Sequence, residues 1–543
     1  MNLFDIVLAG PLLAFFIILV LPKDSTDLIR KVALVISILI FIASLGLIPA
    51  VLATPAQMSH VTDVQWISVP NIRYHVGLDG VSMWIVLLST LLTPICVLIS
   101  WNYISKRQKE FYAFLMLLEF GLIGVFAALD LFLFYVFWEV VLVPMYFLVG
   151  IWGYERRIYA AVKLFVYTMT GSVLMLGAII YLYNKTGTFD YMALMGLITS
   201  GRLVFGHLES TLLFLAFFAA FAVKVPIFPL HTWLPDAHVE APTAGSVMLA
   251  SVMLKMGTYG LLRICIPMFP EAARENASWI AALAIIGIIY GALVAMVQPN
   301  FKKVIAYSSV SHLGFVVLGL FSFTQQGLDG AVYQMLNHGI TTGALFMLVG
   351  MMYERRHSLE IKAFGGVATP APWLSTIFLI TMFASIGLPG LNNFVGEYLV
   401  LLGAGISNYT WAVFGAIGVI LSACYMLWLY QRIFLGRAPG MPESGGHGHG
   451  HNPAHSGAHD PDTVAQSDPG ASHEHSGFHM PDLVGREWAA LLPLIALMVV
   501  MGIAAQAFLP SIGASNSDAL MKTRGNQEQN VKLDTHNEVA NAR

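Results

Sequence analysis

Charged residues are scarce in this sequence. Lysine, arginine, aspartate and glutamate make up 11% of its 543 residues, whereas soluble domains carry about 25%. Hydrophobic residues reach 57%, and the mean hydropathy is +0.73. The shortage of charge excludes an ordinary soluble globular protein. It predicts an integral membrane protein embedded in the lipid bilayer.

Cysteine is also scarce, and the three cysteines, Cys96, Cys265 and Cys424, are far apart. No two of them have the short spacing of iron–sulfur or zinc ligands. The sequence also lacks the G-x-G-x-x-G and P-loop patterns that bind dinucleotides and nucleotides. We therefore expect no electron carrier, metal or other cofactor in this chain, and no nucleic acid partner.

Apolar runs long enough to cross a bilayer, about 20 residues each, recur along most of the chain. The first begins at residue 3 without the basic flank or cleavage site of a signal peptide, so we interpret it as a retained helix. The predicted fold is an all-α polytopic membrane protein with fourteen transmembrane helices. The expected spans lie near residues 2–21, 31–54, 78–102, 110–129, 130–152, 158–183, 207–231, 243–267, 277–298, 300–322, 330–353, 371–402, 408–435 and 487–509.

The distribution of basic residues predicts the topology. Most lysines and arginines in the connections follow odd-numbered helices, whereas those after even-numbered helices are few: Arg73, Lys185, Arg202, Arg263 and Arg274. Because basic loops stay on the cytoplasmic side, the odd-numbered connections are expected there and both termini outside. The basic C-terminal tail opposes this assignment, but tails beyond the last helix have little influence.

One segment differs from the rest in composition. Residues 441–482 contain eight histidines among glycine, serine, proline and aspartate, and they separate the last two predicted helices. Such a composition cannot bury a core, so it predicts a disordered insertion. Weak surface metal binding by the His-x-His pieces is the alternative, and a catalytic metal site is not favoured.

Ionisable residues occur inside the apolar helices, where they are costly. An acid or lysine at a helix centre costs about 2.5–3.5 kcal/mol on insertion scales and normally faces the protein interior or water. One such residue is compatible with a packing accident, but several on different helices predict a polar line through the protein. The residues are Glu119, Glu139, Lys224, Lys255, His312, His338 and Glu397.

Each of these residues also has a structural interpretation. His312 or His338 alone would often be a hydrogen-bonded core histidine, and Glu119 could simply bond a neighbouring helix. Glu139 and Lys224 could form a buried ion pair, although such pairs often contribute little net stability. Polar stripes favour a functional interpretation, because hydroxyls, amides and imidazoles at helical spacing can hold a chain of waters. The stripes are Ser308, Ser311 and His312, and then Gln334, Asn337, His338, Thr341 and Thr342.

Two of the predicted helices are interrupted. Pro226 and Pro229 follow Lys224, and each lacks an N–H and clashes with the preceding turn, so the helix should break just after Lys224. The segment 384–398, "ASIGLPGLNNFVGEY", repeats this pattern before Glu397. Broken helices are tolerated at membrane depth only where protein or a water-filled cavity surrounds them.

Paired breaks in corresponding helices indicate an inverted repeat around an ion pathway. We therefore divide the chain into helices 1–3 (1–109), a first five-helix repeat (110–267) and a second five-helix repeat (277–435). The His-rich loop (441–482), the last helix (487–509) and a polar tail (510–543) follow. Helices seven and twelve would be the broken ones.

Several motifs resemble one known family. The segments "FYVFWEVVLVPMYFLVGIWGYE" (134–155) and "KVPIFPLHTWLPDAHVEAPTAGSVMLASVMLKMGTYGLLR" (224–263), with "YSSVSHLG" and "LNHG" further on, resemble the antiporter-like subunits of respiratory complex I. The resemblance covers about residues 75–435. Fourteen helices, no long lateral helix and a glutamate at position 397 are similar to the M branch of bacterial NADH–quinone oxidoreductase subunits, whose mitochondrial counterpart is subunit 4. Sister branches typically carry lysine there.

The resemblance implies roles for individual residues. Glu139 would be the acidic partner, Lys224 the central proton-carrying lysine and Lys255 the connecting lysine. His312 and His338 would relay protons through water, and Glu397 would end the second half-channel. Two further candidates for the proton route complete the set: Glu119 and His231.

The resemblance also implies a proton-translocating membrane subunit driven by quinone reduction elsewhere in a complex. FMN and iron–sulfur clusters would belong to partner subunits, and sister antiporter-like subunits would flank this chain. The membrane would be the bacterial inner membrane, with both termini periplasmic. The alternatives are a subunit of a multisubunit cation/proton antiporter, a membrane subunit of a hydrogenase, or an inert scaffold between pumps.

Overall fold

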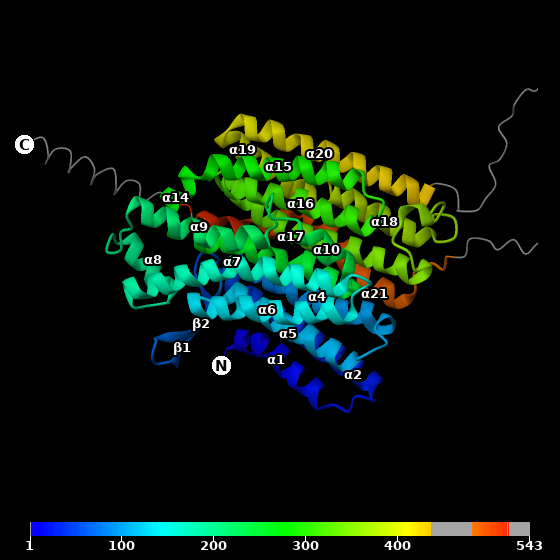
Figure 1. The fold of residues 1–543 in the computed structure, drawn as a ribbon, viewed down its shortest axis with the longest axis horizontal. Coiled ribbons are helices and arrows are strands. Elements are labelled where there is room, and N and C mark those ends of the chain that lie inside the picture. The colour runs from blue at the N-terminus through cyan, green and yellow to red at the C-terminus, as the bar shows by residue number, and fades with distance from the viewer. Residues whose placement is uncertain (1, 436–479, 518–519, 521–543) are drawn as a thin grey trace, which may run out of the picture.

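The computed structural model describes residues 2–435, 480–517 and 520. Thirteen helices in this part of the chain are long and apolar enough to cross a membrane. They lie side by side along the long axis of the molecule (Figure 1). The N-terminal elements are α1 (Leu3–Val20), α2 (Thr26–Leu45), α3 (Ile48–Ala53), the strands β1 (Ser59–Ile67) and β2 (Ile72–Leu78), and α4 (Ser82–Tyr103).

The predicted all-α membrane architecture is confirmed, and one two-stranded sheet is added to it. β1 and β2 pair antiparallel as a hairpin at one end of the bundle, beside the N-terminus (Figure 1). Residues 59–78 mix polar and apolar side chains and lack a long apolar run, so their backbone groups hydrogen-bond across the hairpin. Hydropathy identifies spans but does not detect such a loop structure.

The helix carrying Lys224 breaks where the two prolines predict. The first predicted repeat contains α5 (Gln108–Ala127), α6 (Leu131–Trp152), α7 (Arg157–Thr186), α8 (Tyr191–Thr199), α9 (His207–Lys224) and α10 (Trp233–Glu240). Helix α9 ends at Lys224, and α10 begins at Trp233, so the expected break is confirmed. The indole Nε1 of Trp233 donates to the Val223 carbonyl at 2.9 Å across it.

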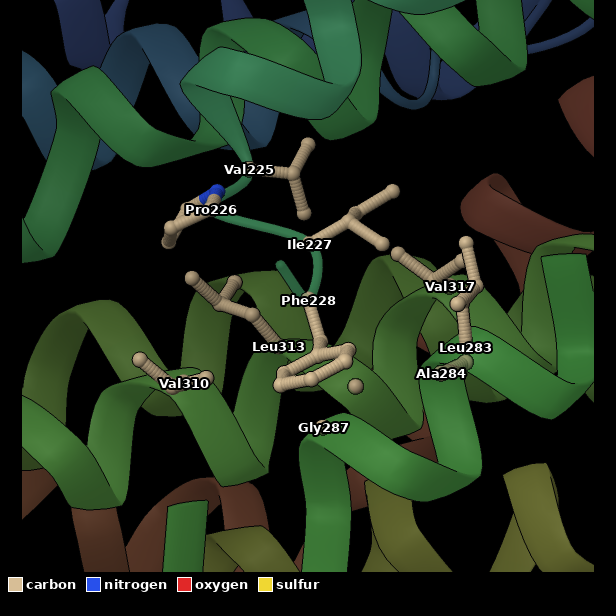
Figure 2. Close-up of a pocket in the computed structure, with 11 residues that line it drawn as sticks. Val225, Pro226, Ile227, Phe228, Leu283, Ala284, Gly287, Val310, Leu313 and Val317 are labelled. Atoms are coloured by element: carbon tan, nitrogen blue, oxygen red, sulfur yellow. The ribbon is translucent and has the colours of Figure 1, made fainter. Parts of the chain in front are cut away.

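The unwound segment passes against the second repeat. Figure 2 shows residues 225–228 leaving the helix, with the side chain of Phe228 directed towards Leu313 and Gly287. A cavity of about 10 Å³ lies between this segment and the helices α15 (Ala277–Met296) and α16 (Phe301–Leu320). That volume corresponds to about one water molecule.

The predicted span 243–267 is not a uniform α-helix. It contains two π-helical turns, η1 and η2, and a turn of this kind is often found at functional sites. The elements are α11 (Thr243–Met248), η1 (Leu249–Met253), α12 (Leu254–Gly260), η2 (Leu261–Cys265) and α13 (Ile266–Met268), followed by α14 (Pro270–Glu275). The first π turn leaves the Ala250 carbonyl free to accept from Lys255 Nζ at 2.6 Å.

The second predicted repeat contains the other break. Its elements are α15 (Ala277–Met296), α16 (Phe301–Leu320), α17 (Gln325–Arg356), η3 (Ile361–Ala363), α18 (Pro372–Ser385), α19 (Asn392–Ser407), α20 (Tyr409–Tyr430) and η4 (Gln431–Leu435). Gly387 (φ 75°) and Gly390 (φ 93°) adopt backbone angles between α18 and α19 that side chains disfavour. This interrupted pair is the twelfth predicted crossing, and it is the predicted span that is missing from the thirteen long continuous helices.

The C-terminal elements are α21 (Gly485–Ile503) and η5 (Ala505–Ala507). Residues 509–517, which were expected to begin a polar tail, are helical and return to the bundle. Ser515 Oγ donates to Asp79, and Asn516 Nδ2 donates to Asp329 Oδ1 at 2.8 Å. The predicted start of the polar tail at residue 510 is therefore wrong, because Asp79 and Asp329 in other parts of the bundle bind this segment. Asn2 Nδ2 donates to Thr62 on β1, so this segment and the N-terminus lie near the same hairpin.

The predicted His-rich loop, 441–482, lies outside the described residues up to position 479. Its last residues contact the bundle. Arg355 Nε donates to the Pro481 carbonyl at 2.7 Å, and the Asp482 carboxylate accepts from the Trp373 and Leu374 amides at 2.9 Å. The last residues of the predicted loop therefore pack against the bundle before α21 begins at Gly485.

A histidine–aspartate pair fastens the hairpin to the first repeat, outside the spanning segments. His75 Nδ1 bonds Asp190, and both side chains are about one-tenth exposed. Burial opposes the charge on His75, but the hydrogen bond and negative charge of Asp190 raise its pKa above the ordinary value. Burial likewise opposes charge on Asp190, whose pKa is nevertheless lowered by its hydrogen bonds to His75 and the Ala193 amide.

We expect His75→Ala to reduce the thermal stability of the purified protein at pH 6, by about 1–2 kcal/mol, as for a charge-assisted hydrogen bond. The raised pKa means that the pair stabilises fully below the unfolded histidine pKa, about 6.5, and loses this effect as pH rises through the folded value. Melting curves of variant and wild type should therefore move closer together as the pH is raised from 6 to 9. His207→Ala, in the exposed His207–Glu275 pair, is the control. An equal loss at both pH values would contradict the assignment.

Candidate functional site: a buried polar line

Lys224 ends α9 in an apolar surrounding. Its side chain is 1% exposed, and among the described residues Nζ has no hydrogen-bond partner. The ammonium lies over the ring of Trp138, 5.3 Å from the centroid. Trp138 precedes Glu139 on α6, so the two charged residues share one neighbourhood.

Glu139 does not form a direct ion pair with Lys224. No carboxylate lies within 4.0 Å of Lys224 Nζ in the described part of the chain, and Glu139 Oε1 also has no partner. A buried structural ion pair is therefore not what the structure shows. An unpaired ammonium and a partly unsatisfied carboxylate are costly in an apolar interior, which favours water between them or a change of protonation.

Lys255 and His338 form the first direct link of the line. Lys255 Nζ lies 2.7 Å from His338 Nδ1, and both residues are fully buried on α12 and α17. With the ammonium donating, Nδ1 must carry the lone pair and Nε2 the proton. The pair therefore joins two titratable groups through one short hydrogen bond.

The two histidines face each other. The rings of His338 and His312 have centroids 6.0 Å apart at an angle of 57°. In both, Nδ1 is bonded and Nε2 lacks a partner within the described chain. A separation of this size exceeds a direct hydrogen bond between rings at this angle and suits a bridging water.

His312 continues the line to Glu397. Its Nδ1 lies 3.0 Å from Glu397 Oε1, which also accepts from Gln334 Nε2 at 3.1 Å. All three side chains are buried, on α16, α19 and α17. Glu397 lies on the second turn after the break, so the line reaches the interrupted crossing.

The polar stripe of α17 holds this break in place. Asn337 Nδ2 donates to the Asn392 carbonyl at 2.8 Å, and Thr341 Oγ1 bonds Asn392 Oδ1 at 3.3 Å. A Cβ at Gly396 would meet Gln334 Oε1 at 2.5 Å, so glycine permits the close approach of α19. The stripe that the sequence assigned to waters is thus partly used to bind Asn392, the first residue of α19 after the break.

Two predicted residues lie off this line. Glu119 on α5 is fully buried with neither oxygen hydrogen-bonded among the described residues, so no hydrogen bond joins it to another candidate there. His231 is 2% exposed in the unwound segment, with its ring 5.7 Å from Phe228 and 5.2 Å from Tyr290. The structure brings together Lys255, His338, His312 and Glu397, and it does not join Glu119 or His231 to them.

Two buried residues escaped the sequence reasoning. His238 on α10 is fully buried, stacks on Phe346 at 4.5 Å and has neither ring nitrogen bonded in the described chain. Lys302 on α16 is 3% exposed, although its position near a basic loop suggested a surface residue. One signal for His238 was available in the sequence: it lies two residues before Glu240, the last residue of α10, in a segment with prolines on both sides.

The site contains no evident place for a bound metal. Among residues 2–435 and 480–517, no group of three or more histidine, cysteine, aspartate or glutamate side chains is arranged to hold an ion. The lysine, imidazole and carboxylate groups of the line can transfer protons among themselves.

Comparison with known proteins places this arrangement in a family. The family described as "NADH:quinone oxidoreductase/Mrp antiporter, TM" matches residues 128–423, more than half of the chain. NADH-quinone oxidoreductase subunit M of Rhodobacter capsulatus is 45% identical over 452 residues, covering 80% of this chain and 86% of the relative. NADH-ubiquinone oxidoreductase chain 4 of Marchantia polymorpha is 44% identical over 436 residues, covering 80% and 87%.

A solved structure extends the similarity to the whole fold. A chain in respiratory complex I from Thermus thermophilus with bound NADH matches with a TM-score of 0.80 at 28% identity. The match covers 96% of this chain and 99% of that one. This chain therefore belongs to the NADH:quinone oxidoreductase/Mrp antiporter family of membrane proteins.

Proposed function

We propose that this chain is a proton-translocating, antiporter-like subunit of an NADH–quinone oxidoreductase. One observation carries the proposal: Lys255, His338, His312 and Glu397 form a buried line of titratable groups that crosses from the first repeat to the second. Intramembrane ionisable residues are costly and mark ion or proton routes. The names of the relatives at 44–45% identity supply the enzyme to which the route would belong.

The hydrogen-bonded imidazole nitrogens define a relay along which protons can move in either direction. A proton from Lys255 Nζ passes to His338 Nδ1, while the proton on Nε2 leaves to a bridging water. The water passes a proton to His312 Nε2, and His312 Nδ1 releases one to Glu397 Oε1. Each imidazole thus accepts on one nitrogen and donates from the other, which the observed contacts of Nδ1 and the unpartnered Nε2 support.

Lys224 and Glu139 would load this relay. Burial favours the neutral amine of Lys224, and the nearby carboxylate favours the ammonium. A change in the position or charge of Glu139 would therefore make Lys224 take up or release a proton. Water would bridge Lys224 to Lys255.

The energy would come from partner subunits. Quinone reduction there, with FMN and iron–sulfur clusters outside this chain, would drive the charge changes. We propose sister antiporter-like subunits on both sides, a bacterial inner membrane location, and both termini on the periplasmic side. The N-terminus and residues 509–517 both bind at or beside the hairpin, which supports placing the two termini on one side of the membrane.

A cation/proton antiporter subunit is the second candidate, because the matching family includes Mrp antiporters. Glu397, where sister branches carry lysine, favours the oxidoreductase. Affinity purification of the tagged chain, followed by mass spectrometry and reconstitution into vesicles, separates the two. We expect flavin and iron–sulfur subunits to co-purify and NADH with quinone to drive proton movement. Cation-driven proton exchange without NADH oxidation would establish the antiporter instead.

A further inference from the structure

Lys302 binds the free end of the broken helix. The short helix α10 ends at Glu240, and its last carbonyls point towards the beginning of α16. Lys302 Nζ donates to the carbonyls of Ala241 at 2.6 Å and Val239 at 3.3 Å. Its ammonium also lies 4.9 Å from the ring centroid of Tyr154.

The chemistry of this contact suits a helix end. The last carbonyls of a helix lack partners within the helix and carry partial negative charge, so a cation there is favourable. Lys302 itself is held in place, since Asn300 Oδ1 accepts from the Lys302 amide at 2.9 Å and caps α16. The buried ammonium is therefore directed at α10 from a fixed helix start.

The same end of α10 is also tied to the first repeat. The Tyr154 amide donates to the Glu240 carbonyl, and the Arg156 amide donates to Glu240 Oε2, both at 2.9 Å. These bonds join α10 to the end of α6, the helix that carries Glu139. Lys302 adds a bond from α16, the helix that carries His312, so one helix end links both halves of the proposed route.

The other end of α10 has no continuous helix to hold it, because residues 225–232 are unwound. Lys163 Nζ on α7 bonds Asp236 Oδ2 at 2.7 Å, but that pair is partly exposed. The buried anchor from the second repeat is Lys302. Without it, two carbonyls would lose their charged donor, and α10 would be less firmly held against α16.

We propose that Lys302 is a positioning residue that fixes α10, and with it the unwound segment beside Lys224, relative to the second repeat. This inference rests on the proposed function for its effect on proton transfer. The position of α10 itself is independent of that function. Lys302 acts through the backbone of Val239 and Ala241, and it is not a member of the relay.

Three variants of the intact complex test this role. Lys302→Met removes the donors but keeps the length of the side chain. Lys302→Arg keeps donors to carbonyls yet cannot release a proton. Lys303→Met is the matched control, because Lys303 is the neighbouring lysine, is less buried, and makes no side-chain hydrogen bond or ion pair to the described part of the chain.

Two readouts are measured: hydrogen–deuterium exchange of residues 225–241, and NADH-driven proton uptake by vesicles. We expect Lys302→Met to speed exchange about tenfold and to lower uptake about fivefold, since local opening tracks lost anchoring contacts. Lys302→Arg should retain most uptake and near-normal exchange, and Lys303→Met should match the wild type.

Each other outcome decides against the proposal. Lost uptake with unchanged exchange in Lys302→Met, or lost uptake in Lys302→Arg, would make Lys302 a proton carrier. Faster exchange with normal uptake would show that anchoring has no bearing on transport. If the wild type itself moved no protons with NADH, the proposed function would fail, while the exchange measurement would still test the anchor.

Discussion

Lys224→Ala is expected to lower NADH-driven proton uptake to less than about a tenth of the wild-type rate in an assembled complex, because no other group replaces it. The ammonium is buried and unpaired at the end of α9, and the nearest aromatic partner is Trp138. Alanine removes the titratable group at the end of α9, immediately before the break. Coupled quinone reduction should fall with uptake.

Glu139→Ala should have a similar effect for a different reason. The carboxylate does not contact Lys224, so its influence acts through charge at a distance and through water. Glu139→Gln keeps the shape and should be nearly as impaired as Glu139→Ala. Lys106→Ala, at an exposed side chain, is the control. Vesicles with an internal pH dye provide the measurement, and full uptake in Lys224→Ala or Glu139→Gln would remove that residue from the mechanism.

The breaks in the helices were predictable because their causes are local. Proline removes an amide donor and clashes with the preceding turn whatever surrounds it, so the end of α9 at Lys224 follows from residues 224–229. The glycines and the proline at 387–390 act in the same way before α19. Charges within apolar runs also identified the residues that the structure joins, from Lys255 to Glu397.

The partners of those charges could not be predicted from the same information. That His312 meets Glu397, and Lys255 meets His338, depends on how α12, α16, α17 and α19 pack. Hydropathy gives no angle or depth for a helix. The structural alternative for Glu139 and Lys224, a direct ion pair, could not be decided from the sequence for the same reason, since neighbouring helices need not bring two charges into contact.

Burial by a distant segment also escapes a reading of hydropathy. Lys302 stands near a basic connection at the start of a helix, which suggested a surface residue. Its ammonium nevertheless binds the end of α10, some sixty residues earlier in the chain. Residues 509–517 were assigned to a tail, although Asp79 and Asp329 bind them. In both cases a polar side chain forms its hydrogen bond with a partner that is remote in sequence, and the local composition does not identify that partner.

Glu397→Gln is the second substitution with a large expected effect. Glutamine preserves the size of the side chain and can still accept from Gln334 Nε2, but it cannot take a proton from His312 Nδ1. Uptake in vesicles should fall below about a tenth of the wild-type rate, while the complex assembles normally. Normal uptake in this variant would show that the route does not pass through Glu397.

Glu397→Lys separates two requirements at the same position. Sister branches of the family typically carry lysine there, so a titratable amine beside the broken helix should restore part of the uptake lost in Glu397→Gln. The end of the side chain at position 397 packs against Gly387, where an added Cβ would meet Glu397 Oε2 at 3.0 Å, so the lack of a side chain at Gly387 permits this approach. His312 Nδ1 can accept from an ammonium. The Gln334 amide must rotate to offer its oxygen, which weakens its bond from Asn337 and limits the recovery. A lysine variant as inactive as glutamine would mean that the terminal group must be an anion to receive the proton.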